Sequence, residues 1–338
     1  MNPFYIVIIH IVSYTKKYLH YINESINNDF LVCIVNIKKL CYNLLKNRKG
    51  ASEYMEKRKQ DCISNSCMIF FMLCMILRFI EYFLIETDKT VIGENVIHKI
   101  VGIIILALIL KKRDISWGDI GFKKNDFISS TLKGLLLGVV CFSISFGLEL
   151  AILALQGNSA HFEIYISSFS LTGSQIKNTN LVYFLLCILF NIVNVWMEEG
   201  IFRGFFIRKL SERNSFMKAN IIAAFLFGIW HIIMPIRSYM SKEMSFETML
   251  FIGIGYIVLS GVMGLKWGIL YQMTENIWIG FADHLFNNTI ATNMLHVVSL
   301  TGVDELQIIR ILFAQLISFT IVFVIYLSKK SRRRINGI

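Results

Sequence analysis

The sequence predicts an all-α protein: a polytopic bundle of about eight transmembrane helices. Of its 338 residues, 55% are hydrophobic and only 17% are charged, whereas about a quarter of a soluble domain is charged. Mean hydropathy is +0.58, and apolar runs of membrane-spanning length recur after residue 66. These observations exclude an ordinary soluble enzyme. The net charge of +11 is then expected of basic membrane loops, so we expect the lipid bilayer and not nucleic acid as a partner.

The amino-terminal region, residues 1–66, differs from the rest of the chain. Its apolar segments 4–11 and 30–37 are too short to cross about 30 Å of hydrocarbon, and basic residues separate and follow them. Interfacial helices on an anionic membrane surface are one interpretation. A signal-like first segment is another, although no small-residue cleavage site is visible. The seven cysteines form no C-x-x-C pair and predict neither a disulfide framework nor a zinc site.

Residues 67–338 are expected to form the transmembrane domain. Its connecting segments 111–126, 207–218 and 328–338 are basic, and the connections between these hold fewer cations. An even number of spans with both ends in the cytoplasm satisfies the positive-inside rule at every strongly charged loop. We therefore expect a multi-pass protein of the cell membrane with a cytoplasmic carboxy terminus, and the Ile-, Lys- and Asn-rich composition indicates a bacterial source. The expected spans are residues 67–86, 96–110, 128–155, 181–206, 219–234, 247–272, 277–293 and 306–327.

Two adjacent acids and an arginine lie inside the fourth expected span. A charge near mid-membrane costs at least ~2.5–3.5 kcal/mol, so such groups usually face the interior of a bundle or a watered cavity. Glu199 and Arg203 are spaced i, i+4 and can form an ion pair. That pairing would leave Glu198 as the candidate general base. The alternative is an architectural cluster that holds helices together through Arg203.

Two later spans carry histidines in apolar surroundings. His231 precedes Pro235, which can end the helix; a hydrogen-bonded packing histidine is an equally good interpretation of His231 alone. His284 and Asn288 are spaced i, i+4 and share a helix face. Asp283 lies about 100° away and could orient a neighbouring group or face another helix.

These polar groups are expected to meet at one depth. At ~1.5 Å of rise per residue, Glu198, His231, His284 and Asn288 fall within a layer only ~6 Å thick. Asn287, at i+3 from His284, is the alternative to Asn288. The three helices therefore predict one shared polar site.

The ordered set resembles the motifs of the CPBP family, which comprises the CAAX prenyl endopeptidases and their bacterial bacteriocin-processing or Abi relatives. The similarity covers about residues 111–293, and Asp283 stands where the family commonly has a small or apolar residue. The motifs that carry the resemblance are Glu198-Glu199-x-x-x-Arg203, Phe227-x-x-x-His231 and His284-x-x-x-Asn288.

The resemblance implies an intramembrane endopeptidase that acts on a membrane-associated peptide or protein. Glu198 would activate the attacking water, with His231 assisting or orienting it. His284 and Asn288 would face the scissile carbonyl, where the amide can donate to the developing oxyanion. The residues that would hold the helix and bias the charge on the base are Glu199 and Arg203.

Two further questions stay open in the sequence. Zinc could be held by Glu198, His231 and His284, but no H-E-x-x-H helix is present, and we expect a metal-independent enzyme with no required cofactor. The same polar layer could also serve a non-catalytic scaffold or a bacteriocin-immunity protein. A transporter is a weaker alternative, because no convincing internal repeat is visible.

Overall fold

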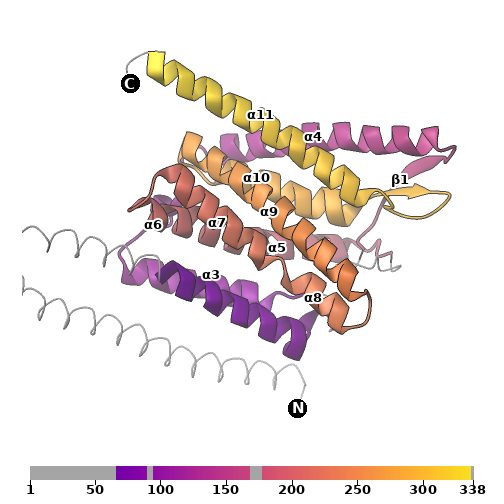
Figure 1. Ribbon diagram of the computed structural model, residues 1–338, viewed down its shortest axis with the longest axis horizontal. Coiled ribbons are helices and arrows are strands. Elements are labelled where there is room, and N and C mark those ends of the chain that lie inside the picture. Colours follow the sequence, from indigo (N-terminus) through magenta and orange to yellow (C-terminus); the bar gives the residue numbers. More distant parts are fainter. Residues whose placement is uncertain (1–65, 90–93, 168–176, 336–338) are drawn as a thin grey trace, which may run out of the picture. The chain divides into compact units, whose positions relative to one another are not determined.

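The computed structural model describes residues 66–89, 94–167 and 177–335. The expectations for residues 1–65, including the interfacial helices, lie outside these ranges. Ile63–Ile338 form one compact unit, built from packed helices and one small sheet (Figure 1). After a first helix at residues 66–80, the elements are η1 Glu81–Ile85, η2 Thr87–Lys89, α3 Ile97–Lys112, η3 Gly118–Ile120, α4 Phe127–Leu155, β1 Ala160–Ile164, α5 Leu181–Glu198, η4 Glu199–Phe206, α6 Ile207–Ser211, α7 Phe216–Trp230, α8 Ile233–Met240, α9 Phe246–Thr274, α10 Trp278–Phe286, η5 Asn287–Met294, β2 Leu295–Ser299 and α11 Gln307–Ile335.

The predicted polytopic helical bundle is confirmed. All eight expected spans are largely helical, but α3 has 16 residues and α10 only nine, fewer than the ~20 that cross a bilayer. Among the described residues, six segments are long and apolar enough to span, where about eight were expected: Ser66–Lys89, Phe127–Leu155, Leu181–Ser211, Phe216–Met240, Phe246–Thr274 and Gln307–Ser331.

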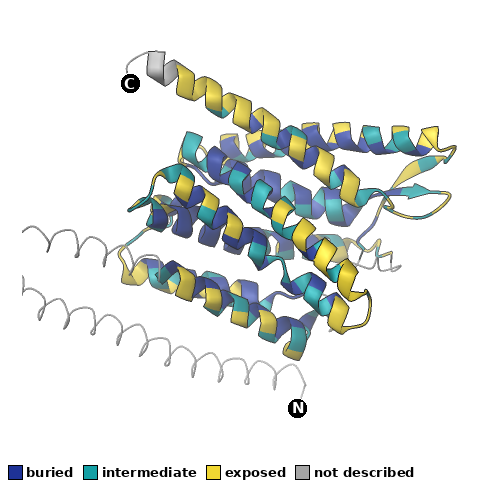
Figure 2. Ribbon diagram, viewed as in Figure 1, coloured by how far each residue is buried: buried dark blue, intermediate teal, exposed yellow. Residues whose placement is uncertain are grey.

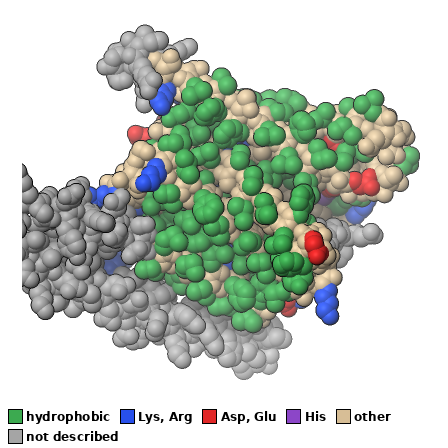
Figure 3. Space-filling view, in the orientation of Figure 1, with side chains coloured by type: hydrophobic (Ala, Val, Ile, Leu, Met, Phe, Trp, Pro, Cys, Tyr) green, Lys and Arg blue, Asp and Glu red, His purple; other side chains and the backbone are tan. Residues whose placement is uncertain are grey.

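Most spans turn an apolar face outward. Only 22% of the most apolar window of Phe246–Thr274 is buried, against 56% of that of Phe216–Met240. Figure 2 shows the exposed residues along the outer sides of α4, α9 and α11, with buried ones between the helices. The face in Figure 3 is covered mainly by hydrophobic side chains, and charged ones lie near its margins. A surface of this kind suits hydrocarbon. The burial figures also show that the segment containing α7 is the most enclosed of the six long apolar segments.

Polar caps fix where several of these apolar helices begin. The side chain of Asn180 accepts a hydrogen bond from the Val182 N–H at the start of α5. Ser215 and Ser245 do the same at the starts of α7 and α9. Each cap satisfies a backbone donor that has no partner within its helix.

The helix that carries His231 does not end at Pro235, contrary to the expectation from sequence. α7 ends at Trp230, His231 is its cap, and α8 then begins at Ile233. Pro235 lies in the first turn of α8, where the backbone N–H that proline lacks would have no helical partner in any case. The break therefore falls at the histidine itself.

Glycines allow two pairs of helices to approach closely. A Cβ atom at Gly134 of α4 would overlap the carbonyl oxygen of Ile279 in α10. A Cβ atom at Gly268 of α9 would overlap the side-chain amide of Asn220 in α7. Small residues at such contacts let helix backbones pack together in a membrane. These contacts fix α10 against α4 and α7 against α9, and α7, α9 and α10 all carry residues near the candidate site.

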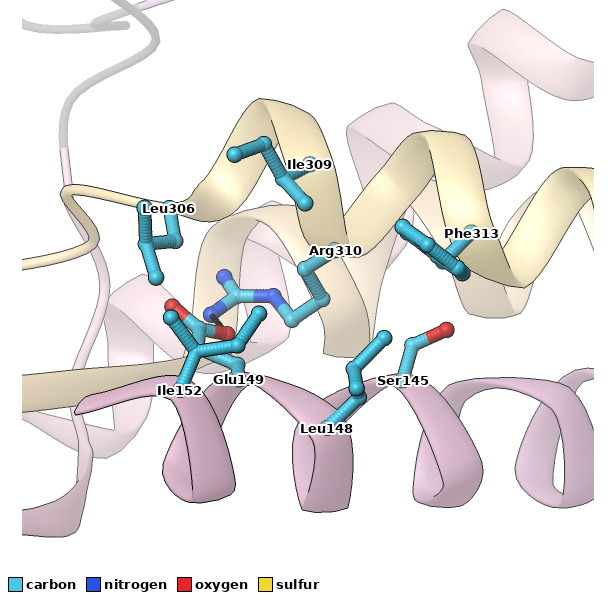
Figure 4. A pocket seen from close by; sticks show the side chains of 8 residues that line it. All are labelled: Ser145, Leu148, Glu149, Ile152, Leu306, Ile309, Arg310 and Phe313. Carbon is cyan, nitrogen blue, oxygen red and sulfur yellow. Dashed lines mark hydrogen bonds and ion pairs between the residues drawn. The ribbon is translucent and has the colours of Figure 1, made fainter. Parts of the chain in front are cut away.

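Buried ion pairs join the last helix to the rest of the bundle. Arg310 of α11 donates to Glu149 of α4 at 2.6 Å and to Asp304 at 3.0 Å. Figure 4 shows the first of these contacts across a small pocket that is lined otherwise mainly by apolar side chains. Both charges of the pair are almost fully buried. Each therefore depends on the other for its stability inside the bundle.

A short two-stranded antiparallel sheet, which lies outside the spans expected from the sequence, connects two distant segments. β1 and β2 pair antiparallel, and His296 of β2 contacts Asp304 at 2.6 Å. Burial opposes ionisation of Asp304, but the hydrogen bond with His296 and the charge of Arg310 together hold its pKa below the ordinary value. Because β2 follows η5 directly, this sheet fixes the end of the segment that contains Asn288.

Candidate active site

The two acids lie where α5 changes to a π-helix. Glu198 is the last residue of α5 and Glu199 the first of η4. Both are buried, with exposed fractions of 3% and 0%. A π-helix widens the turn and is found most often at functional positions. The chain therefore places two carboxylates at an irregular point inside the bundle, where each needs a protein partner.

The ion pair that the i, i+4 spacing predicted is present. Arg203 Nη2 lies 3.4 Å from Glu199 Oε1. The guanidinium also lies over two aromatic rings, 3.9 Å from the centroid of Phe227 and 4.9 Å from that of Trp267. Cation–π contacts of this kind stabilise a desolvated arginine. Gly264 leaves room for it, because a Cβ there would lie 3.4 Å from Arg203 Nη2.

His284 lies between the two carboxylates. Its Nδ1 is 3.0 Å from Glu199 Oε1, and its Nε2 is 3.5 Å from Glu198 Oε2. The imidazole stacks on Trp267, with ring centroids 4.0 Å apart and planes inclined by 16°. The structure thus brings three predicted residues, Glu198, Glu199 and His284, into one cluster.

Asp283 orients the ring on which His284 stacks. Its Oδ2 accepts a hydrogen bond from Trp267 Nε1 at 2.8 Å and one from Lys266 at 2.6 Å. Lys266 donates further hydrogen bonds to α11, through Gln315 and Ser318. This resolves the two interpretations left open for Asp283: it orients a neighbouring group and also faces other helices. Its acidic character compensates a buried lysine, which a small residue could not do.

Glu198 receives a hydrogen bond that the sequence analysis missed. Trp230 Nε1 donates to Glu198 Oε1 at 2.8 Å. The second oxygen, Oε2, accepts no hydrogen bond from the described residues, although His284 Nε2 lies 3.5 Å away. One carboxylate oxygen is therefore fixed and the other remains available to accept a proton or a water hydrogen.

His231 lies at the end of α7, next to Trp230. Its Nδ1 is 2.8 Å from the Phe227 carbonyl oxygen, so Nδ1 carries the proton that is donated and Nε2 is left as an acceptor. The ring is half-buried. Nε2 is thus free to contact a water or a substrate group.

Asn288 is the predicted residue least connected to this cluster. It lies in η5, and its Oδ1 accepts a hydrogen bond from Asn287 Nδ2 at 2.9 Å. Its carbonyl oxygen accepts another from Asn293. Asn287, the alternative, is instead tied to α11 because its Oδ1 accepts from Gln315. Of the two amides, Asn288 retains the freer Nδ2 group.

A metal ion does not fit the arrangement. Among residues 66–89, 94–167 and 177–335, no group of three or more His, Cys, Asp or Glu side chains is placed to hold one. Both nitrogens of His284 face carboxylates, and one oxygen of Glu198 is taken by Trp230. The set Glu198, His231 and His284 would need these contacts to change before it could coordinate zinc.

Comparison with known proteins points to the same segment. Residues 180–290 match the family model described as type II CAAX prenyl endopeptidase Rce1-like. The "Putative membrane peptidase YdiL" of Bacillus subtilis strain 168 is 26% identical over 145 residues, which cover 41% of this chain and 50% of that protein. The chain thus spans about half the length of that curated relative.

Residues 180–290 are thus similar to the CPBP family that the three motifs resemble. The match begins at the cap of α5 and ends within η5, so it encloses all six predicted site residues. The matched family model and this relative are both named as peptidases. The helices outside residues 180–290, including the Ser66–Lys89 span, are not part of the matched segment.

Proposed function

We propose that this chain is an intramembrane endopeptidase of the CPBP type that hydrolyses a peptide bond through a water activated by Glu198. The observation that carries the proposal is the asymmetry of this buried carboxylate: Trp230 holds one oxygen at 2.8 Å, while the other has no hydrogen-bond donor among the described residues. A base held in this way can accept a proton without losing its position. Glu199 is engaged by Arg203 and His284 and serves as support.

The other residues divide the remaining tasks. His231, with Nε2 free, orients the water or receives its second hydrogen. His284, between the carboxylates, can relay a proton to the leaving amine. The Asn288 Nδ2 group donates to the developing oxyanion. Hydrolysis by this set needs a base, a proton donor and an oxyanion donor, and requires no metal.

The proposed substrate is a membrane-associated peptide or protein. The matched family model is named for prenylated CAAX peptides, but an Ile-, Lys- and Asn-rich chain of bacterial type favours a peptide pheromone, a bacteriocin precursor or the tail of a membrane protein. The site lies within helices that expose apolar faces, which favours a substrate held at a lipid bilayer. We propose a cell-membrane location with a cytoplasmic carboxy terminus, in agreement with the basic residues after α11.

Comparative peptidomics of membranes tests the function. Cells that express the wild type are compared with cells that express Glu198→Gln, and an uncut precursor should accumulate only in the variant. With that peptide, the purified variant should cleave about 10²- to 10⁴-fold more slowly. Glu212→Gln, at an exposed acid after α6, is the matched control and should cleave normally. Equal cleavage by Glu198→Gln would refute the proposal.

The same variant separates catalysis from binding. If the chain is a scaffold or an immunity protein, Glu198→Gln should accumulate in the membrane and keep the cellular phenotype of the wild type. If the chain is a hydrolase, the Glu198→Gln variant should lose that phenotype. Cleavage by the purified wild type should also survive exhaustive chelation; activity that returns only with added zinc would show that the metal-independent mechanism is wrong.

A further inference from the structure

Five lysine or arginine side chains are buried in the described part of the chain. Four of them have a carboxylate partner, in the pairs Lys99–Glu94, Arg203–Glu199, Lys266–Asp283 and Arg310–Glu149. The fifth, Arg78, is 4% exposed and forms no ion pair with any described residue. A buried cation without a counter-charge is costly, so the groups that contact the Arg78 guanidinium must compensate for the lost hydration.

Arg78 packs on the tryptophan that contacts Glu198. Its Nη1 donates to the Trp230 carbonyl oxygen at 2.8 Å, and its Cζ lies 4.4 Å from the Trp230 ring centroid. Tyr82 lies on the same guanidinium, 5.1 Å from Cζ. Arg78 is therefore fixed against the carbonyl and the ring of Trp230, and the N–H of that ring donates to Glu198.

The nearest acid in sequence does not compensate Arg78. Glu81, one turn later, has both oxygens engaged: Oε2 contacts His98 Nδ1 at 2.5 Å, and Oε1 accepts from the Ile97 N–H at 2.8 Å and from the Thr87 hydroxyl. Glu81 thus joins its own helix to the start of α3. The Arg78 guanidinium lies instead against Trp230, whose indole N–H donates to Glu198.

A count of charges in the site gives the same result. Two carboxylates, Glu198 and Glu199, lie side by side, and Arg203 is paired with Glu199 at 3.4 Å. One arginine leaves a net negative charge in a region of low dielectric constant, where it is strongly disfavoured. When both acids are ionised and His284, which lies between them, is neutral, Arg78 supplies the second positive charge and makes the site neutral.

We propose that Arg78 is a positioning residue of the active site: it balances the charge of Glu198 and holds the Trp230 indole in place as its hydrogen-bond donor. This deepens the function proposed above and rests on it. Arg78 lies in the Ser66–Lys89 span, before the segment 180–290 that matches the family model. Under this proposal, the active site includes a residue of the Ser66–Lys89 span, which lies outside the matched segment.

A double-mutant cycle on the purified full-length protein tests the charge balance without requiring cleavage. Arg78→Met keeps much of the side-chain volume but removes the charge, and Glu198→Gln removes the negative charge. Arg78→Met should lower the melting temperature in detergent, and this loss should shrink by at least half in the Glu198→Gln background. If Arg78→Met accumulates only together with Glu198→Gln, that result also supports the proposal.

The matched control is Arg310→Met, which removes a buried cation whose partners are Glu149 and Asp304. Its loss of melting temperature should be equal with and without Glu198→Gln. Arg78→Lys, which keeps the charge, should melt above Arg78→Met. Equal losses for Arg78→Met in both backgrounds, or failure of the double variant to accumulate, would overturn the proposal.

The two proposals can fail separately. If Glu198→Gln still cleaves the substrate, the proposed hydrolytic role of Glu198 is wrong, whereas coupling in melting temperature between Arg78 and Glu198 would remain. If the coupling is absent while Glu198→Gln is inactive, Glu198 is still the base and Arg78 has only a packing role.

Discussion

Replacement of Lys266 by methionine gives a direct test of how the bundle around the site is stabilised. The ammonium group is fully buried and has three partners: Asp283 at 2.6 Å, Gln315 at 2.7 Å and Ser318 at 2.9 Å. Lys266→Met fills similar space but leaves the Asp283 carboxylate with only the Trp267 N–H as donor. Removal of one partner from a buried ion pair costs about 3–5 kcal/mol.

This cost can be converted into a melting temperature. At about 2.1 cal/mol/K of unfolding entropy per residue, a unit the size of Ile63–Ile338 loses about 2 °C per kcal/mol, so Lys266→Met should melt about 6–10 °C below the wild type. Thermal denaturation in detergent, followed by intrinsic tryptophan fluorescence, measures this. Asp283→Asn added to Lys266→Met should recover part of the loss, because it removes the unpaired charge. Lys218→Met, at an exposed lysine of α7, is the control. An unchanged melting temperature for Lys266→Met would refute the reasoning.

Three further variants test other contacts. Trp230→Phe removes the donor to Glu198, and a hydrogen bond to a charged group is worth about 1.5–3 kcal/mol, so kcat should fall about 10- to 160-fold with KM unchanged. Gly134→Ala should lower stability by about 1–3 kcal/mol through overpacking, while Gly147→Ala, with open space around it, should not. The pKa of Asp304 is lowered on folding, so ionised Asp304 raises the free energy of unfolding at neutral pH. This stabilisation is lost as the pH falls through the lowered pKa, and Asp304→Asn should therefore flatten the acid limb of a curve of stability against pH.

The sequence predicts best what lies within one helix. The ion pair between Glu199 and Arg203 follows from a spacing of four residues, and that spacing survives in the π-helix η4. The common depth of Glu198 and His284 also follows from helical rise, and the structure places their side chains 3.5 Å apart at the closest charged atoms. Local geometry is enough for both results.

Contacts between helices were not predictable, because they depend on how each helix is rotated and on where it crosses its neighbours. The Trp230 N–H on Glu198 and the Asp283–Lys266 pair are both of this kind. So is the two-stranded sheet, whose strands come from distant parts of the chain. Arg78 did carry a signal: like Glu198, it is a charge inside an apolar run, which usually marks a site. The same criterion applied to every span would have identified it.

The depth at which Glu198 is enclosed has a kinetic consequence. With 3% of its surface exposed, the carboxylate cannot meet a peptide bond until neighbouring helices separate, and motions of packed helices occur in microseconds to milliseconds or more slowly. If opening is slower than bond cleavage, turnover measures the opening of the bundle rather than the chemistry. The rate should then vary with the thickness and fluidity of the bilayer and be insensitive to the residue that follows the cleaved bond. Solvent isotope effects would be small for the same reason.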